Sequence, residues 1–253
     1  MKNEKLDVIL LAAGYSTRLY PLTKNFPKPL LEVAGKPVIT NIVEKLEALK
    51  EIDKVYVVTN NRYYNRFIEW KKSLKTKLKI EIINDGTLHE KDKLGAIGDI
   101  SLVLKLKSPD SDILIIAGDN LFSSSLNPFY NYFKGKNENV IVIDELPTLE
   151  QAKRHGVVDL DRDSKIISLI EKPENPKSKL IAHVVYLLKK KSINKIKKYL
   201  DEGNNQDAPG YFLQWLYKKD AVYGFKIDGK IFDIGTPETL EKARREFTFS
   251  SYS

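Results

Sequence analysis

The sequence predicts an α/β protein, with a doubly wound, mostly parallel sheet in its N-terminal half and an α+β C-terminal half. Two observations support this prediction. Short, uninterrupted apolar runs alternate with helical patterns up to about residue 118, and such runs are typical of strands buried on both faces of a parallel sheet. After about residue 139 the strands follow one another through turns instead, as in hairpins.

The N-terminal half shows both signals in order. Pro37 suits the first turn of a helix because its φ is already helical, and Ile39, Ile42 and Leu46 follow at helical spacing. The right-handed crossovers that such an order requires place successive strands side by side in one sheet. The expected strands are residues 7–13, 54–59, 78–83 and 112–118, and the expected helices are residues 37–49, 62–75 and 94–106.

The C-terminal half is richer in strands. Asp161 and Asp163 lie in a turn between two strands, so we expect them to be structural. Thr236 followed by Pro237 is a strong helix start, because a Thr hydroxyl caps the first turn. The expected strands are residues 140–143, 156–160, 165–170, 180–188, 222–227 and 230–234, and the expected helices are residues 192–200, 211–217 and a last one from residue 236. No linker divides the chain, so we expect one domain over residues 1–253, with halves of about 1–138 and 139–253.

Composition narrows the classes of function. The 253 residues contain no cysteine, which excludes disulfide scaffolds, cysteine zinc sites and thiol nucleophiles. The net charge of +8 suits polyanions, a class that includes nucleic acids, acidic membranes and nucleotides. The densest basic segment, residues 189–198, has Ile193 and Ile196 at helical spacing, so its lysines fit a solvated helix face better than a nucleic-acid site. Without a signal peptide or a long apolar window, we expect a cytoplasmic protein with no membrane partner.

A polar loop suited to a phosphate-bearing ligand follows the first expected strand. Ligands of open α/β sheets bind beyond the carboxyl ends of the strands, where small residues allow close approach to a base or phosphate. Hydroxyl and guanidinium groups donate to phosphate oxygens, and Lys28 lies between two prolines that stiffen the backbone. The other candidates are Ala12, Ala13, Gly14, Thr17 and Arg18. A glycine turn followed by a solvated loop with ordinary surface cations would also explain these residues.

Two aspartates end strands in positions suited to a metal. Asp119 follows the buried strand at residues 112–118, and Asp233 ends a strand before the capped helix. Mg²⁺ takes one or two carboxylates and completes its shell with water and substrate phosphates. An aspartate at the end of a strand is, taken alone, most often a turn former or a helix cap.

A charged pair, Glu171 and Lys172, precedes Pro173 at the end of another strand. Glu171 could accept hydrogen bonds from sugar hydroxyls, and Lys172 could pair with a phosphate. An ordinary charged pair on an edge strand remains the alternative.

The loop string as a whole is more specific than its parts. Residues 11–23, LAAGYSTRLYPLT, and residues 27–30, PKPL, resemble the signature of the sugar-1-phosphate nucleotidylyltransferases, which make NDP-sugars. Ser16 stands where many members of that family have a second glycine. The resemblance extends from about residue 7 to residue 247 and implies a Rossmann-like, GT-A-like fold with Mg²⁺ as cofactor.

The resemblance also implies roles for particular residues. Arg18 would hold the departing pyrophosphate, Lys28 would neutralise charge around the reacting phosphates, and both would be catalytic together with Lys172. His155 and His183 would each place an imidazole near the sugar. The implied NTP-binding residues are Leu11, Ala12, Ala13, Gly14, Thr17, Arg18, Lys28, Asn84, Gly95 and Asp119, the sugar-phosphate residues are Gly156, Glu171 and Lys172, and the metal ligands are Asp119 and Asp233.

The implied reaction joins an NTP to a sugar-1-phosphate and releases pyrophosphate. We expect glucose-1-phosphate with dTTP or UTP, and we leave homo-oligomerisation open. The alternatives are a cytidylyltransferase acting on a phosphate such as phosphocholine, and a catalytically silent nucleotide-binding regulator. The residues after the last expected helix are too few for the β-helix domain of some relatives, so acetyl transfer is not expected.

Overall fold

The computed structural model describes residues 5–247, which form two compact units. The first unit contains the described residues up to 94, residues 116–127 and residues from 228 on, and the second contains residues 95–115 and 128–227. The chain passes from the second unit to the first within strand β6 (Asp112–Ala117). None of the helices in residues 5–247 has the length and apolar character needed to cross a membrane. The expectation of one domain over residues 1–253 stays a prediction.

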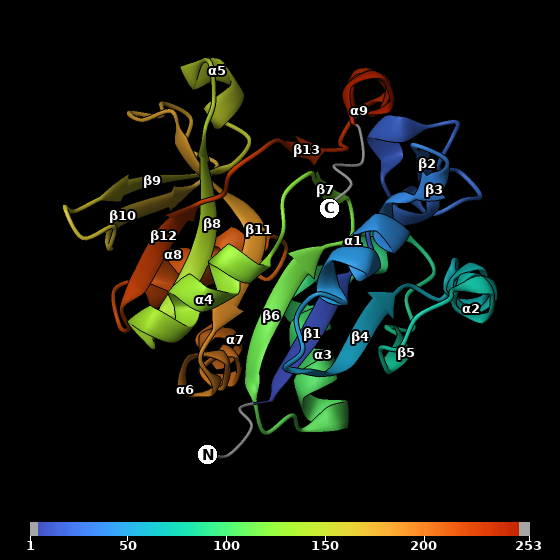
Figure 1. Ribbon diagram of the computed structural model, residues 1–253, viewed down its shortest axis with the longest axis horizontal. Helices are drawn as coiled ribbons and strands as arrows, with labels where there is room; N and C mark the ends of the chain where they lie inside the picture. Colours follow the sequence, from blue (N-terminus) through green and yellow to red (C-terminus); the bar gives the residue numbers. More distant parts are fainter. Residues whose placement is uncertain (1–4, 248–253) are drawn as a thin grey trace. The chain divides into compact units, whose positions relative to one another are not determined.

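The first unit is built on parallel strands. Strand β1 (Leu6–Leu11) pairs with β4 (Ile52–Thr59), and β4 pairs with β5 (Ile80–Asn84), all in parallel register (Figure 1). The predicted apolar runs form these strands: Val8, Ile9 and Leu10 are completely or almost completely buried. A strand covered on both faces needs such a run, because each of its faces packs against other residues.

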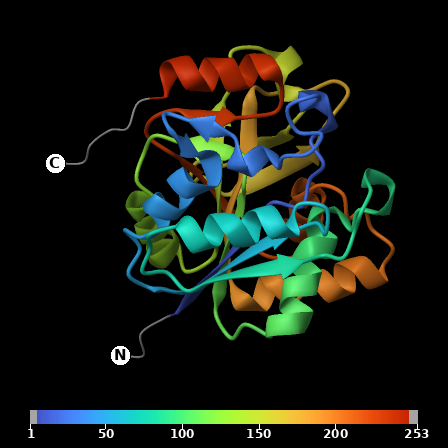
Figure 2. The ribbon, with the colours of Figure 1, turned by 90° about the vertical axis from the view of Figure 1, so that its right-hand side faces the viewer.

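Helices and short turns connect these strands. Helix α2 lies along β5 and buries Phe67 and Trp70 (Figure 2). The expected helix at residues 37–49 begins one residue later and ends earlier, with Pro37 as its cap residue. The helices are α1 (Val38–Leu46) and α2 (Tyr64–Ser73), the 3-10 turns are η1 (Thr17–Leu19), η2 (Lys28–Leu30) and η3 (Glu90–Asp92), and a small hairpin consists of β2 (Glu32–Val33) and β3 (Lys36–Pro37).

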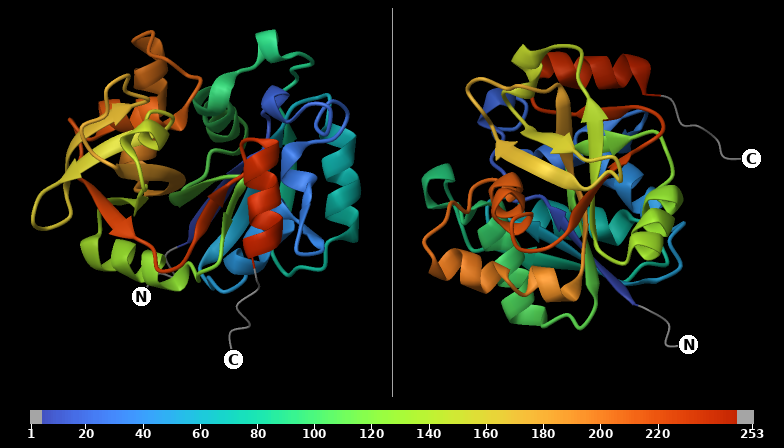
Figure 3. Two further views of the ribbon diagram at one scale, coloured as in Figure 1. Left: turned by 90° about the horizontal axis from the view of Figure 1, so that it is seen from above. Right: turned by 90° about the vertical axis from the view of Figure 1, so that its left-hand side faces the viewer.

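The end of the described chain completes the first unit. Strand β13 (Ile231–Asp233) pairs antiparallel with β7 (Asn120–Phe122), and helix α9 (Pro237–Glu246) packs beside β2 and β13 (Figure 3). The Thr236 cap is confirmed: its hydroxyl accepts from the Thr239 N–H at 3.3 Å, and the Thr239 hydroxyl accepts in return from the Thr236 N–H. These elements share an apolar cluster of Leu19, Leu31, Val33, Val38, Leu121, Phe232, Ile234, Leu240, Ala243 and Phe247.

The second unit has a mixed sheet. Strand β11 pairs antiparallel with β9 and with β8, β9 pairs with β10, and β12 pairs in parallel with β8. The β9–β10 hairpin, seen in yellow in the right panel of Figure 3, has the expected turn: the Asp161 carboxylate accepts from the N–H groups of Asp163 and Lys165, each at 2.9 Å. The strands are β8 (Asn139–Glu145), β9 (Gly156–Leu160), β10 (Ile166–Glu171), β11 (Leu180–Leu188) and β12 (Val222–Lys226).

Three helical segments of this unit differ from the sequence-based expectation, and one of them, the four-residue helix α5 (Leu149–Ala152), was not predicted. The predicted helix at 192–200 is two shorter helices, joined by a tighter turn in which the Lys195 N–H donates to the Ser192 carbonyl at 3.1 Å. The carboxylate of Asp220 accepts from the Ser192 hydroxyl and from the Lys195 ammonium at this junction. Helix α4 was not predicted, since its aromatic-rich sequence has weak helix propensity; it buries Phe129 and Phe133. The helices are α3 (Gly95–Lys107), α4 (Asn127–Lys136), α5 (Leu149–Ala152), α6 (Lys190–Ile193), α7 (Ile196–Asp201) and α8 (Pro209–Leu216).

A parallel sheet with helices in one unit and a mixed sheet with helices in the other confirm the predicted α/β class.

Candidate active site

Asp119 lies beside the carboxyl end of β1. The residue before it, Gly118, donates its N–H to the Leu11 carbonyl at 2.8 Å. A Cβ added to Gly118 would lie 3.0 Å from the Leu11 oxygen and 3.3 Å from Cγ of Pro29, closer than side chains normally approach. The glycine therefore allows the strand end, the Lys28–Pro29 segment and Asp119 to lie together.

Lys28 and Asp119, predicted separately from two motifs, form an ion pair. The Lys28 ammonium donates to Oδ2 of Asp119, and the two side chains are only 14% and 20% exposed. Partial burial lowers the screening of the pair by water, so this interaction is stronger than an ordinary surface ion pair. Lys28 begins turn η2, where Pro27 and Pro29 restrict the backbone on either side.

Arg18 and Asp233 lie in the same part of the first unit. The β13–β7 pairing places Asp233 opposite Asn120, the residue after Asp119. A Cβ added to Gly235 would lie 3.9 Å from both Nη2 of Arg18 and Oδ1 of Asp233. Four of the residues singled out in the sequence are thus gathered in one unit: two lie in turns η1 and η2, one directly precedes β7 and one is in β13.

The donor set suits a magnesium ion that is shared with a ligand. Asp119, just before β7, and Asp233, in the paired strand β13, would supply carboxylate oxygens. Within residues 5–247, no group of three or more His, Cys, Asp or Glu side chains is placed to hold a metal. Two carboxylates are enough for Mg²⁺ when substrate phosphates and water complete its octahedron, whereas a tightly held structural metal would require more protein ligands.

The loop after β1 is held on one side and open on the other. Ala12 donates its N–H to Val58 at 2.8 Å, and the Asn60 side-chain amide donates to the Ala13 carbonyl, also at 2.8 Å. Gly14 has no heavy atom within 4 Å of the position that a Cβ would take. Thr17 and Arg18 are exposed in turn η1, so their donor groups can reach a ligand.

Asn84 and Gly95, the two residues expected to face the base, already have protein partners. The amide of Asn84 donates to Oδ1 of Asn61 at 2.6 Å and accepts from the Gly86 N–H at 2.9 Å. Gly95, in the second unit, has φ 76°, and a Cβ there would lie 2.4 Å from the Gln206 carbonyl oxygen. Its missing side chain therefore makes room for the protein's own backbone, and a role in base recognition stays a prediction for both residues.

Glu171 sits between two glycines of the second unit. It pairs with Gly156 across the β9–β10 ladder, and a Cβ on Gly156 would lie 2.9 Å from Oε2 of Glu171. A Cβ on Gly210 in helix α8 would lie only 1.8 Å from the same oxygen. Burial raises the pKa of the Glu171 carboxyl, and the nearby Lys172 ammonium opposes this shift. Gly210 was not predicted, because nothing local in the sequence indicates which strand residue a helix glycine will face.

Lys172 has a strained backbone at the end of β10. Its φ is 49°, a left-handed conformation that is uncommon outside glycine, and its N–H donates to the His155 carbonyl at 3.0 Å. Its side chain is exposed. Such strain is often found at functional sites, where the surrounding structure enforces it.

The two imidazoles lie on the other face of the sheet from Glu171. Ala182 shares the face of Gly156 and Glu171, so the next residue along β11, His183, points to the opposite face. The His155 ring packs edge-on against the His183 ring, with 6.2 Å between the two ring centroids. Burial and the neighbouring cations lower the pKa of His155 to about 4, so this imidazole is neutral at physiological pH.

Five lysines in and directly before α6 and α7 have carboxylate partners. Lys189 contacts Asp112 at 2.6 Å and Lys191 contacts Glu138 at 3.0 Å, and further pairs join Lys190 to Asp110, Lys195 to Asp220 and Lys197 to Asp201. These carboxylates neutralise much of the charge that the segment could offer to a phosphate backbone.

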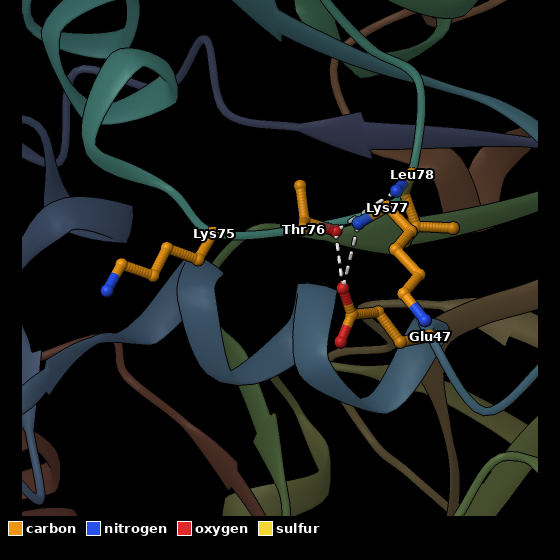
Figure 4. Close-up of a pocket in the computed structure, with 5 residues that line it drawn as sticks. All are labelled: Glu47, Lys75, Thr76, Lys77 and Leu78. Atoms are coloured by element: carbon orange, nitrogen blue, oxygen red, sulfur yellow. Dashed lines mark hydrogen bonds between the residues drawn. The ribbon is translucent and has the colours of Figure 1, made fainter.

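A surface hollow of the first unit lies apart from these groups. It is lined by Glu47, Lys75, Thr76, Lys77 and Leu78 (Figure 4). The Glu47 carboxylate accepts from the Thr76 hydroxyl at 2.6 Å and from the Lys77 N–H at 3.3 Å, while the Lys75 side chain points away (Figure 4). The Glu47 carboxylate therefore fixes the segment between α2 and β5 through these two hydrogen bonds, which gives it a structural role.

The α/β fold, together with cations and carboxylates gathered near the carboxyl end of β1, defines a class of protein whose site suits phosphate-bearing ligands. The model of the nucleotidyl transferase family matches residues 7–249, and the chain belongs to that family.

Relatives and solved structures agree with this family. The chain is 32% identical over 241 residues to the bifunctional protein GlmU of Methanocaldococcus jannaschii, a match that covers 95% of this chain and 54% of GlmU. It is 28% identical over 250 residues to a Sulfolobus acidocaldarius protein provisionally named mannose-1-phosphate guanyltransferase, covering 98% of this chain and 64% of that protein. The chain thus spans about half to two thirds of the length of these relatives.

A solved structure shows the same fold over almost the whole chain. A Bacillus anthracis protein, provisionally named glucose-1-phosphate thymidylyltransferase and solved in complex with sucrose, has a TM-score of 0.82. The two chains are 24% identical, and the match covers 97% of each.

Proposed function

We propose that the protein transfers a nucleotidyl group from an NTP to a sugar-1-phosphate and releases pyrophosphate. The observation that carries the proposal is the gathering of Arg18, Lys28, Asp119 and Asp233 in one unit of a nucleotidyl transferase family member. The names of the relatives favour a sugar-1-phosphate as acceptor. Glucose-1-phosphate with dTTP or UTP is the first pair to test.

The chemistry asks for charge and position more than for proton transfer. A phosphate oxygen of the sugar-1-phosphate, already an anion at neutral pH, attacks the α-phosphorus of the NTP. A new P–O bond forms while the bond to the β-phosphate oxygen breaks, and pyrophosphate leaves with that electron pair. No general base is required, so catalysis depends on holding two polyanions together and on stabilising the charge that develops.

The residues of the first unit would meet the NTP. The exposed Thr17 hydroxyl and Arg18 guanidinium would donate to phosphate oxygens, with Arg18 on the departing pyrophosphate. Lys28 would keep a positive charge beside the reacting phosphates. Asp119 and Asp233 would hold Mg²⁺, which when bound neutralises phosphate charge and polarises the reacting phosphorus.

The residues of the second unit would meet the sugar-1-phosphate. Gly156 and Gly210 leave room for the carboxylate of Glu171, which would accept hydrogen bonds from sugar hydroxyls. Lys172, exposed and fixed by its strained backbone, would pair with the sugar's phosphate.

A matrix of dTTP, UTP, CTP and GTP against sugar-1-phosphates and phosphocholine, with Mg²⁺ and pyrophosphate release as the signal, tests the proposal. We expect release with a sugar-1-phosphate. Release only with CTP and phosphocholine would identify the cytidylyltransferase alternative. Nucleotide binding without release in any combination would identify a silent regulator.

Two substitutions test the metal ligands. Asp119→Asn and Asp233→Asn should each lower Mg²⁺-dependent turnover by about 100-fold or more, because each removes a charge from the proposed cation site, while both proteins stay folded. Asp163→Asn, in the β9–β10 turn, is the control and should retain activity. Wild-type turnover by either variant would remove that aspartate from the site.

A further inference from the structure

Tyr15, in the loop after β1, is the first donor in a series of hydrogen bonds that continues through Thr87 to Asp85. Its side chain is 4% exposed, and its phenol oxygen lies 2.9 Å from the hydroxyl of Thr87, which is 7% exposed. The Thr87 hydroxyl donates to Oδ1 of Asp85 at 2.8 Å. Because that hydroxyl has a single proton, already given to Asp85, Tyr15 must be the donor in the first bond.

Asp85 and Thr87, which accept in this series of hydrogen bonds, are themselves fixed to the sheet. Asp85 donates its N–H to the Thr59 carbonyl at the end of β4, and Asn61 donates its N–H to the Thr87 carbonyl, each at 2.9 Å. The Thr87 N–H also bonds the Asp85 carboxylate at 2.7 Å. Thr87 is thus a rigid acceptor, and Tyr15 is the part of the loop that docks on it.

The docked residue precedes a strained one. Ser16 has φ 52°, a left-handed conformation that is unfavourable for a residue with a Cβ. From the other side, the Thr23 hydroxyl donates to the Ser16 carbonyl at 2.8 Å, and the Tyr63 phenol donates to the Thr23 carbonyl at 2.6 Å. Strain of this kind persists only where surrounding contacts enforce it.

We propose that Tyr15 and Thr87 are positioning residues for the nucleotide: their hydrogen bond holds the loop in the conformation that presents Gly14, Thr17 and Arg18 to the NTP. This inference rests on the proposed function. Neither side chain touches the nucleotide; each acts through the backbone of the loop. The loop is ordered before the ligand arrives, so the NTP does not bear the entropic cost of ordering it.

Without the Tyr15 hydroxyl the loop after β1 is less well ordered in the free protein. The entropic cost of ordering it then reduces the affinity for the NTP. A buried hydrogen bond contributes about 0.5–1.5 kcal/mol net, which corresponds to a change of about 2- to 12-fold in an equilibrium constant. We expect Tyr15→Phe and Thr87→Val to raise the KM for the NTP by about that factor. The KM for the sugar-1-phosphate should change by less than twofold, because its proposed ligands lie on other segments of the chain.

Matched variants separate positioning from general stability. Thr87→Ser keeps the hydroxyl and should retain the wild-type KM for the NTP. Tyr56→Phe also removes a buried phenol oxygen from the first unit, but from strand β4, where Asp7, Asp53 and Glu81 are its charged neighbours. It should leave both KM values unchanged, even if the unfolding temperature falls.

A second measurement tests the part played by Ser16. Glycine adopts φ > 0 at no steric cost. In Ser16→Gly the loop therefore keeps its conformation with less help from its anchor, the Tyr15–Thr87 hydrogen bond. The effect of Tyr15→Phe on the KM for the NTP should therefore shrink in the Ser16→Gly background. An effect of unchanged size there would overturn the link between the anchor and the strained residue.

The results distinguish this inference from the proposed function. If the wild type releases pyrophosphate, and Tyr15→Phe and Thr87→Val lower the unfolding temperature without a selective rise in the KM for the NTP, the hydrogen bond is merely structural and the inference fails alone. If the wild type binds dTTP, UTP, CTP or GTP without turnover, the dissociation constant from calorimetry replaces KM. If it binds none of the four, both proposals fail.

Discussion

Replacing Gly210 by alanine tests whether helix α8 leaves room for the Glu171 carboxylate. Glycine within a helix usually costs about 0.5–1 kcal/mol relative to alanine, so the change would normally stabilise. Here the new methyl carbon would lie 1.8 Å from Oε2 and 2.5 Å from Cδ of Glu171. The carboxylate must move, and insertion into a packed site costs about 1–3 kcal/mol. The two effects leave a net loss of about 1 kcal/mol, within a range of about 0–2.5 kcal/mol.

Gly135→Ala is the matched control for this change. Gly135 lies in helix α4 of the same unit, and no heavy atom lies within 4 Å of its Cβ position. Urea unfolding should show Gly135→Ala stabilised by about 0.5–1 kcal/mol and Gly210→Ala destabilised. The KM for the sugar-1-phosphate should rise only for Gly210→Ala. A Gly210→Ala protein as stable as Gly135→Ala, with an unchanged KM, would refute the described packing of Glu171.

Three further results are expected. Thr236→Ala should lose about 1 kcal/mol of stability in urea unfolding because helix α9 loses its cap, and Thr236→Ser, which keeps the hydroxyl, should lose much less. Burial raises the pKa of Glu171 above its ordinary value of 4.5, so the folded wild type loses stability as the pH rises above about 4.5 towards the raised pKa. Glu171→Gln should therefore become more stable relative to the wild type from about pH 4.5 upward. A stability difference that does not depend on pH would contradict this. The pKa of His155 is lowered to about 4, so protonation of the unfolded chain destabilises the wild type as pH falls from about 6.5 to about 4; His155→Asn should flatten that part of the pH–stability profile.

The sequence was most informative where one local signal determines an element. The apolar run that forms β1 must be covered on both faces, and the Thr236–Pro237 start of α9 is a local hydrogen-bonding pattern. Helix α4 has no comparable signal. Its aromatic residues form a helix because Phe129 and Phe133 become buried, which depends on distant parts of the chain.

The sequence indicated which residues belong to the candidate site better than it indicated which of them contact one another. The motifs identified Lys28 and Asp119, but their ion pair joins positions 91 residues apart. Likewise, the contact between Glu171 and Gly210 depends on how α8 packs on β10. No periodicity or spacing in the sequence could identify Tyr15 and Thr87, since each resembles an ordinary loop residue until the hydrogen bond between them is seen.

The pairing of β13 with β7 has a consequence for synthesis of the chain. Domains generally fold from the N-terminus as the ribosome extends them. A nascent chain that ends at residue 227 already contains the whole second unit, yet it lacks Asp233, helix α9 and several members of the apolar cluster around Leu19. The two aspartates can therefore meet only after residue 233 has been synthesised. A nascent chain ending at residue 227 would leave β7 without its partner strand β13 and could not assemble the proposed cation site. The loop after β1 is therefore synthesised well before the proposed site can form.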